Sequence, residues 1–385
     1  MITDTDALAR FCAEAASSPY VTVDTEFLRE RTYYAQLCLV QLARPGTGDE
    51  GAVLVDTLSD RLSLEPLYEL FRNKRVVKVF HAARQDLEIF QTDAGVLPEP
   101  FFDTQVAAMV CGYGDQVGYE TLVRQVAHGH VDKSSRFTDW SRRPLSAAQM
   151  AYALADVTHL RRIYEVLARR LSETGREAWV EEELAVLTDP ATYRSDPEEA
   201  WTRIKTRSSA PRFLAALREL ARLRETLAQE RNVPRGRILK DDALLELAAN
   251  RPRTLEDLGK SRLLLREARR GEIAEGILAA VATAEALPPS EIPHAPEAHH
   301  RKPGAEALAD LLRVLLKARA ESAGVAQRLI ASGAELDAIA SGEGADVPAL
   351  HGWRLEVFGR DALRLKRGEI ALAADGAAVK VVPLA

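Results

Sequence analysis

The sequence predicts an α/β domain with one mixed sheet, followed by modules that are almost wholly helical. Three observations support this. Segments rich in Val, Tyr and Leu succeed one another with short connections before residue 60. A further strand-like segment then precedes a series of helical stretches, and a helical period dominates from residue 212 onward. A chain of 385 residues is expected to hold two or three domains.

The N-terminal α/β domain is expected over residues 1–173. Strands are predicted at Tyr20–Phe27, Tyr33–Leu42 and Ala52–Asp56, and because their connections are short, they should pair antiparallel. These are followed by a helix at Leu62–Arg72, a strand at Val76–Phe80, and helical stretches at 83–93, 103–112, 119–127 and 146–171. One mixed sheet followed by helices implies a domain of about 170 to 200 residues.

The rest of the chain is expected to be helical. A helical connector over 174–211 leads to a first module at 212–287, which carries one apolar stripe formed by Leu214, Leu217, Leu220, Leu223 and Leu227. Proline-rich sequence then predicts a linker at 288–303. A second helical module is expected at 304–385. It should end in a small hairpin in which Ile370–Ala373 and Ala378–Val382 flank Asp375-Gly376.

Charge and composition narrow the class of function. The net charge of −6 argues against indiscriminate binding to nucleic acid, but residues 212–287 carry 15 basic and 12 acidic side chains, which leaves specific binding open. No run of about 18 apolar residues predicts a membrane span. Three widely spaced cysteines and a polar, acidic N-terminus fit a cytoplasmic protein without a disulfide framework, a Cys-rich metal site or a signal peptide.

Candidate metal ligands begin on the first predicted strand. Asp24 and Glu26 are two residues apart, so both carboxylates leave the same face of VTVDTEF, where a divalent cation is a natural partner. Alternatively, both are solvated acids of an edge strand. Asp86 follows the fourth predicted strand by six residues. It either belongs to a functional site at the strand ends or is an ordinary acid in the first turn of a helix. Tyr152 and Asp156 are four residues apart and share one face of a helix. They either belong to the site or are a Tyr at the edge of the core and a solvated Asp.

Further residues have two open interpretations. A loop between the third and fourth acids holds basic and aromatic side chains that either contact a nucleic-acid substrate or anchor the loop: Lys133, Arg136, Trp140, Arg142 and Arg143. His81 either supports the metal site or is a packed or capping residue. Basic residues of the first helical module form either a solvated face or a phosphate track: Arg235, Arg237, Lys240, Arg251, Arg253, Lys260 and Arg262.

The order of these motifs is rarer than any one of them. Asp-x-Glu on the first strand, His-x-x-x-x-Asp after the fourth and Tyr-x-x-x-Asp on a late helix resemble the DEDD exonuclease superfamily, in its Tyr-containing subclass. DWSRRPLS at 139–146, DPATYRSDPEEAWTRIK at 189–205 and two following helical modules are similar to the ribonuclease D family. The resemblance implies a ribonuclease H-like 3′–5′ exonuclease domain and two HRDC-like helical domains.

The resemblance also implies two-metal phosphodiester hydrolysis with two divalent cations, Mg²⁺ or Mn²⁺. Asp24, Glu26 and Asp156 would hold the ion that activates water, Asp24 and Asp86 the second ion, and Tyr152 would orient the attacking water. The expected substrate is RNA with a single-stranded 3′ end, with tRNA precursors as the family's typical case, cleaved to nucleoside 5′-monophosphates. A monomer is expected. A 3′–5′ exonuclease on DNA and a noncatalytic RNA-binding scaffold are the alternatives.

Overall fold

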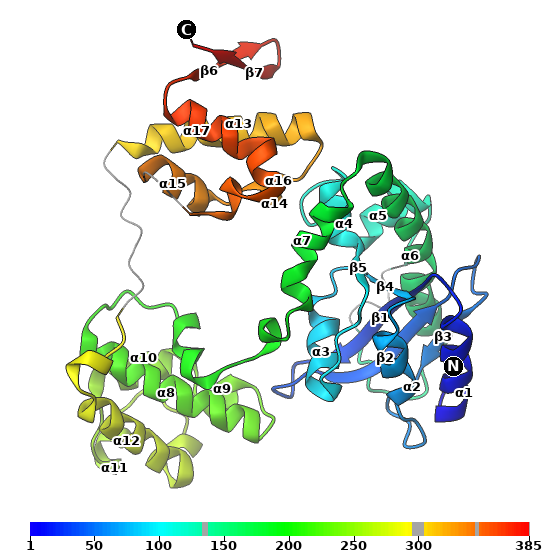
Figure 1. Cartoon of the computed structure of the whole chain (residues 1–385). Coiled ribbons are helices and arrows are strands. Elements are labelled where there is room, and N and C mark those ends of the chain that lie inside the picture. Colours follow the sequence, from blue (N-terminus) through cyan, green and yellow to red (C-terminus); the bar gives the residue numbers. More distant parts are fainter. Residues whose placement is uncertain (133–137, 295–303, 343–345, 385) are drawn as a thin grey trace.

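A mixed five-stranded sheet forms the centre of the N-terminal domain in the computed structural model, which describes residues 1–132, 138–294, 304–342 and 346–384 (Figure 1). The strand order is β3-β2-β1-β4-β5, in which β1 pairs antiparallel with β2 and parallel with β4. The strands are β1 Tyr20–Leu28, β2 Gln36–Ala43, β3 Ala52–Val55, β4 Val77–Phe80 and β5 Phe101–Asp103. The predicted antiparallel pairing of the first three strands is confirmed.

Helices cover both faces of this sheet (Figure 1). The helices of this part of the chain are α1 Thr5–Ala15, α2 Glu65–Arg72, α3 Arg84–Ala94, α4 Thr104–Val110, α5 Tyr119–Leu122, α6 Ala147–Thr174 and α7 Glu177–Thr188. Helix α1 and strand β5 are additions to the elements that the sequence predicts. Helix α1 is capped by Asp4, which accepts a hydrogen bond from the Ala7 amide. Strand β5 has only three residues, too few for a strand pattern to be recognised in the sequence.

Helix α6 is the element that completes the acidic site. It starts with a capping box in which Ser146 and Gln149 bond each other's backbone amides, and it continues for 28 residues. Its contact with the sheet includes a hydrogen bond of 2.9 Å from the Thr22 hydroxyl on β1 to the carbonyl of Val157. The buried side of α6 is therefore fixed against the strand that carries Asp24 and Glu26.

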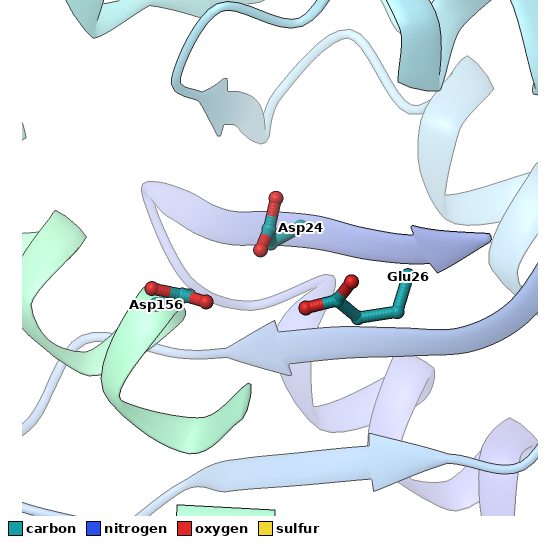
Figure 2. A group of neighbouring side chains, drawn as sticks. All are labelled: Asp24, Glu26 and Asp156. Atoms are coloured by element: carbon teal, nitrogen blue, oxygen red, sulfur yellow. The ribbon is translucent and has the colours of Figure 1, made fainter. Parts of the chain in front are cut away.

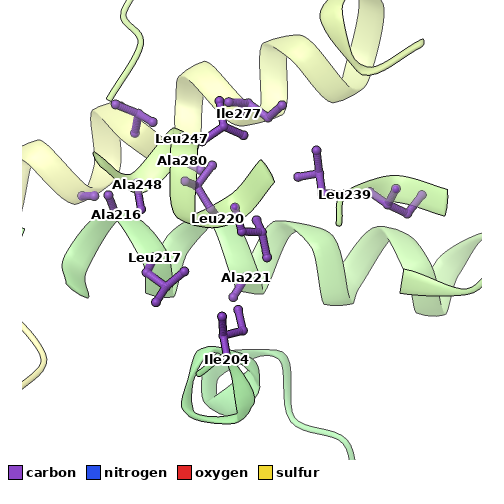
Figure 3. Close-up of a cluster of buried hydrophobic side chains, with 14 of the residues drawn as sticks. Ile204, Ala216, Leu217, Leu220, Ala221, Leu239, Leu247, Ala248, Ile277 and Ala280 are labelled. Atoms are coloured by element: carbon purple, nitrogen blue, oxygen red, sulfur yellow. The ribbon is translucent and has the colours of Figure 1, made fainter. Parts of the chain in front are cut away.

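A first helical module follows the N-terminal domain, and its apolar stripe is buried as predicted (Figure 3). Its helices are α8 Pro211–Glu230, α9 Arg235–Ile238, α10 Asp241–Asn250, α11 Leu255–Gly259 and α12 Gly271–Ala286. Leu217 and Leu220 are fully buried, and Leu223 packs against the same core from a half-buried position. Ile204, from the connector, and Ile292 also belong to this core, so the packed unit extends on both sides of 212–287.

A second helical module with its own core ends the chain. Its elements are α13 Ala305–Ala323, α14 Gln327–Ile330, α15 Gly333–Ser341, α16 Gly352–Arg354, α17 Arg360–Lys366, β6 Ile370–Asp375 and β7 Ala378–Pro383. The last two form the predicted antiparallel hairpin, with Gly376 at a positive φ of 61° in the turn. Across the described residues, no helix is both long and apolar enough to span a membrane.

Aromatic side chains connect both helical modules to the preceding part of the chain. The first module contacts the β1–β2 connection, and the second contacts helix α7. Tyr33, in the connection between β1 and β2, donates a hydrogen bond to Glu225 of α8, and the Arg235 guanidinium lies 4.7 Å from its ring centroid. On the other side, Trp179 of α7 stacks on Trp353 of α16 with ring centroids 4.5 Å apart. Both modules are thus attached to segments adjoining the sheet domain.

Candidate active site

Three carboxylates converge where α6 crosses β1 (Figure 2). Asp24 and Glu26 leave the same face of β1, because side chains alternate along a strand, and Asp156 reaches them from α6. One oxygen from each of the three lies within 4.8 Å of the others. The Asp-x-Glu pair of the strand and the acid of the late helix therefore meet in one cluster, as the sequence predicts.

The cluster is acidic and partly buried, with Asp156 as its buried member. Burial, and then the charge of Asp156, raise the pKa of Asp24 well above its ordinary value. Burial, followed by the charges of Asp24, Asp156 and Asp86, raises the pKa of Glu26 to about 9. The pKa of Asp156 is raised as well, chiefly by burial. In the described part of the chain, no Lys, Arg or His forms an ion pair with these three carboxylates, so the protein supplies no positive charge to compensate them when they ionise.

Asp86 lies next to this cluster but is held differently. It stands in the first turn of α3, is 7% exposed, and accepts a hydrogen bond from the Thr25 hydroxyl. Burial and the charge of Asp24 raise its pKa well above the ordinary value. The fourth acid is therefore near enough to interact with Asp24, although it is not a member of the cluster of three.

Tyr152 lies one helical turn before Asp156 on α6, and both side chains line the same cavity. Burial and the neighbouring carboxylates raise the pKa of the Tyr152 phenol far above its ordinary value, so it keeps its proton at neutral pH. Its ring lies 6.1 Å from that of Trp140, centroid to centroid. A protonated phenol at this place can orient a polar group beside the cluster but does not remove a proton from it.

A cavity of about 540 Å³ opens beside the carboxylates. Asp24, Tyr152 and Asp156 line it together with His81 and Tyr119. Tyr119 is not among the residues that the sequence singles out. Its hydroxyl donates to the carbonyl of Asp156 at 2.7 Å, which braces α6 where that acid stands. A Tyr in a helix of four residues carries no local signal that distinguishes it from a core aromatic.

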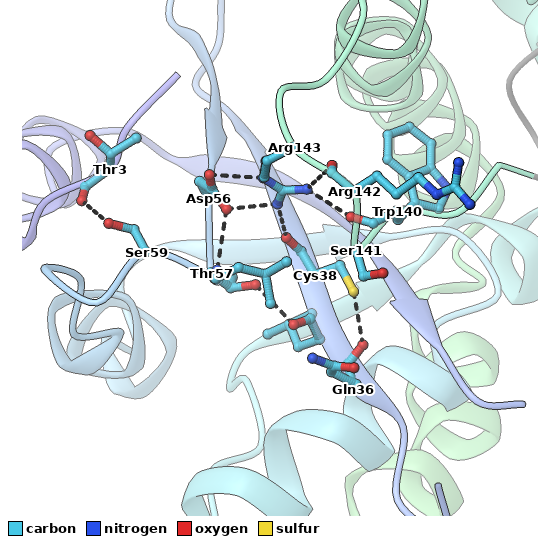
Figure 4. A network of polar contacts seen from close by, with 12 residues as sticks. Thr3, Gln36, Cys38, Asp56, Thr57, Ser59, Trp140, Ser141, Arg142 and Arg143 are labelled. Atoms are coloured by element: carbon cyan, nitrogen blue, oxygen red, sulfur yellow. Dashed lines mark hydrogen bonds and ion pairs between the residues drawn. The ribbon is translucent and has the colours of Figure 1, made fainter. Parts of the chain in front are cut away.

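The loop before α6 has an anchoring core (Figure 4). Arg143 forms two hydrogen bonds with Asp56, of 2.9 and 2.6 Å, and a third with the carbonyl of Cys38. Trp140 is 2% exposed and packs against the side of the sheet that α6 covers. These contacts favour the anchoring interpretation for Trp140 and Arg143. Arg142 has 83% of its side chain exposed, while Lys133 and Arg136 lie outside the described residues.

Three of the basic residues singled out in the first helical module have acidic partners. Arg235 pairs with Glu225, Arg253 with Glu285, and Lys260 with Asp257 and Glu256. Ion pairing of this kind favours the interpretation of a charged, partly self-compensated face for these three positions.

Comparison with known proteins agrees with this site. Residues 1–172 match a 3′–5′ exonuclease family model and residues 213–281 match an HRDC domain model. A protein named Ribonuclease D from Jannaschia sp. (strain CCS1) is 66% identical over 381 residues, which is 99% of this chain and 98% of that protein. The chain belongs to the ribonuclease D family. Another Ribonuclease D, from Granulibacter bethesdensis, is 50% identical over 385 residues, 99% of this chain and 96% of the relative.

A solved structure extends the likeness to three dimensions. Escherichia coli RNase D, described as an exoribonuclease involved in structured RNA processing, superposes with a TM-score of 0.82 at 30% identity, covering 96% of this chain and 98% of that one. This ribonuclease D family member therefore combines an exonuclease domain with an HRDC domain and a further helical region. Exonucleases with this acidic set depend on divalent metal, and the cluster of Asp24, Glu26 and Asp156 is where this chain supplies oxygen ligands.

Proposed function

We propose that the chain is a metal-dependent 3′–5′ exoribonuclease that releases nucleoside 5′-monophosphates, with Asp24, Glu26, Asp86 and Asp156 as the ligands of two divalent cations. The observation that carries this proposal is the cluster of a buried Asp156 with the partly buried Asp24 and Glu26, which has no cationic side chain among the described residues to compensate it. Enclosed carboxylates are costly unless a positive charge joins them.

The donor set fits hard divalent ions. All four proposed ligands are carboxylates, and hard cations such as Mg²⁺ and Mn²⁺ prefer oxygen. When bound, the ions would lower the pKa of a water molecule and compensate negative charge on the phosphate. Asp24 interacts with the other acids of the cluster and with Asp86, which makes it the ligand that both ions would share.

The other residues act around that set. Tyr152 would orient the attacking water through its hydroxyl, since that group is protonated and the residue lines the cavity together with Asp156. Tyr119 and Trp140 hold the elements that carry the site, through α6 and the preceding loop. Of the proposed substrate contacts, Arg142 is 83% exposed and pairs with Asp139 at 3.4 Å, and a phosphate of the RNA would have to compete with that carboxylate for its guanidinium.

The proposed substrate is RNA with a single-stranded 3′ end, with tRNA precursors as the cellular case. An RNA whose end must enter the acidic cavity is selected by its accessible tail more than by its sequence. We also propose two HRDC-like domains, at 212–287 and 304–385, joined by the linker at 288–303 and preceded by the exonuclease domain at 1–173 and the connector at 174–211. A monomer in the cytoplasm completes the proposal.

The deciding experiment offers purified protein a 3′-tailed RNA and its DNA twin, each with Mg²⁺, Mn²⁺ or EDTA, and identifies the products. The proposal expects stepwise shortening of the RNA to nucleoside 5′-monophosphates with either metal, no shortening in EDTA, and much slower attack on DNA. Equal degradation of both strands would support the DNA exonuclease alternative. Binding of RNA without any degradation would support the noncatalytic scaffold.

A further inference from the structure

One wall of the active-site cavity is formed by a histidine for which the proposed mechanism has no use. His81 follows Phe80, the last residue of β4, and lines the same cavity as Asp24 and Asp156. Its Nδ1 lies 3.0 Å from the hydroxyl oxygen of Thr104, at the start of α4. His81 therefore stands beside the carboxylates and is fixed by a residue of a neighbouring element.

The hydrogen bonds of Thr104 decide which nitrogen of the ring carries the proton. The Thr104 hydroxyl has a single proton, which it donates to the carbonyl of Phe80 at 3.0 Å. In its contact with His81 it can then only accept, so Nδ1 of His81 is the donor. The remaining nitrogen, Nε2, carries a lone pair and no proton when the ring is neutral. Burial lowers the pKa of His81, which favours that neutral form, although the charge of Asp103 opposes it.

The surroundings hold this ring in place. Asp103 accepts hydrogen bonds from the backbone amides of Ala82 and Ala83, at 3.0 and 2.9 Å, which fixes the chain directly after His81. The ring of Tyr119 lies 5.4 Å from the imidazole, centroid to centroid. Among the described residues, no hydrogen bond to Nε2 is formed. His81 thus lines the cavity with its Nδ1 side fixed, and its Nε2 has no protein donor among the described residues.

An acceptor at this place selects a particular part of an RNA substrate. Phosphate oxygens carry no proton at neutral pH, so a neutral imidazole with a free lone pair cannot bind them. Next to a scissile phosphate, the donor that RNA has and DNA lacks is the ribose 2′-hydroxyl. We propose that Nε2 of His81 accepts a hydrogen bond from the 2′-hydroxyl of one of the two nucleotides that flank the scissile phosphate. His81 is then a residue that determines specificity for RNA, an inference that rests on the proposed exoribonuclease function.

The test varies the substrate and the side chain together. A single-stranded RNA is compared with versions in which the last or the penultimate nucleotide alone is 2′-deoxy or 2′-fluoro, groups that cannot donate. For the wild type, we expect one of the two positions to lower kcat/KM about tenfold, the effect of one lost hydrogen bond to a buried partner. The same position should respond to both modifications.

Two variants test the roles of Nδ1 and Nε2 of His81 separately. His81→Asn keeps a polar group near Nδ1, where it can bond Thr104, but has no acceptor at Nε2. It should cleave the all-ribose RNA about tenfold more slowly and lose no more on the modified substrates. His81→Gln places an amide near Nε2 and should regain part of the discrimination. His128→Asn is the matched control, because His128 is exposed outside the cavity with a positive φ of 53° that Asn tolerates, and it should discriminate like the wild type.

The outcomes distinguish this inference from the proposed function. A wild-type enzyme that shortens the modified substrates at the rate of RNA would overturn the role of His81 and leave the exoribonuclease intact. So would a His81→Asn variant that is slowed but keeps the wild-type ratio between ribose and deoxyribose substrates. A wild-type protein that shortens no RNA at all would instead refute the proposed function itself.

Discussion

Glu225 in the first helical module and the acidic cluster of Asp24, Glu26 and Asp156 have opposite surroundings. Glu225, in the first helical module, is 1% exposed and accepts two hydrogen bonds of 2.6 Å from Arg235, besides one from Tyr33. Burial alone would raise the pKa of Glu225, but the bonds from Arg235 and Tyr33 outweigh it and lower the pKa. In the acidic cluster, burial and the carboxylate neighbours act in the same direction, and together they raise the pKa of Glu26 to about 9.

The difference separates a structural carboxylate from a functional one. The fold provides Glu225 with a guanidinium that satisfies both oxygens, so that its charge links the module to the N-terminal domain. Asp24, Glu26 and Asp156 receive no such partner among the described residues. A chain that keeps unpaired acids in one cluster has either a destabilised fold or a cation that joins them.

The largest effect is expected for Asp24→Asn. Because Asp24 interacts with both the cluster and Asp86, loss of its charge should lower turnover of single-stranded RNA about a thousandfold or more. RNA binding should stay close to that of the wild type, and cation-free protein should melt at a higher temperature since a repulsive charge is gone. Turnover and melting temperature measured on the same preparation check both parts. Substantial residual turnover would show that the metal site lies elsewhere.

Tyr152→Phe is expected to have the next largest effect on catalysis. If the hydroxyl positions the attacking water, its loss should lower kcat about a hundredfold while Mg²⁺ affinity and KM change little. Tyr164→Phe, in the same helix but outside the cavity lining, is the control and should keep wild-type turnover. A Tyr152→Phe variant with wild-type kcat would reduce the role of this residue to packing against Trp140.

Glu225→Gln should change stability and leave the chemistry alone. The substitution removes the buried charge that the half-exposed Arg235 bonds, so the free energy of unfolding should fall by about 2 kcal/mol, the value of a hydrogen bond between charged groups. Turnover of a short single-stranded RNA should stay unchanged, because the side chain lies in the first helical module. Denaturant unfolding and a kinetic assay of the same variant measure the two quantities. If Glu225→Gln instead raised the stability, as Asp24→Asn is expected to do, Glu225 and the acidic cluster would not differ in the way described here.

The pH dependence of stability gives a smaller but diagnostic effect. A carboxyl group whose pKa is higher in the folded state than in the unfolded state binds more protons when folded, so stability falls as pH rises between the two values. For Glu26 the window extends from about 4 to about 9. Cation-free wild type should therefore melt at a lower temperature at pH 8 than at pH 6, and saturating Mg²⁺ should remove most of that loss. Equal slopes with and without Mg²⁺ would argue against a cation at this cluster.

Most of the fold and of the acidic site could be predicted from the sequence, because strands and helices each repeat with a period that can be recognised there. Asp24 and Glu26 could be assigned to one face of a strand because side chains alternate along a strand. The stripe with Leu217 and Leu220 could be assigned to one face of a helix because a helix repeats every 3.6 residues. The partners of Trp140 and Arg143 could not be foreseen, since Asp56 and Cys38 are distant in sequence and meet them only after folding. The tautomer of His81 likewise depends on Thr104 and Phe80, which only the tertiary structure brings together.

The central claim is that the acidic cluster is a cation site, and a calorimetric titration with Mg²⁺ tests it most directly. At pH 7 the pKa of about 9 keeps Glu26 protonated in the cation-free protein, so binding must displace a proton. Titrations in two buffers of different ionisation enthalpy count the protons released. We predict saturable binding with release of at least about one proton in the wild type, and weak binding with less release in Asp24→Asn. Heats that are absent, or that are identical in both buffers and in both proteins, would contradict the account.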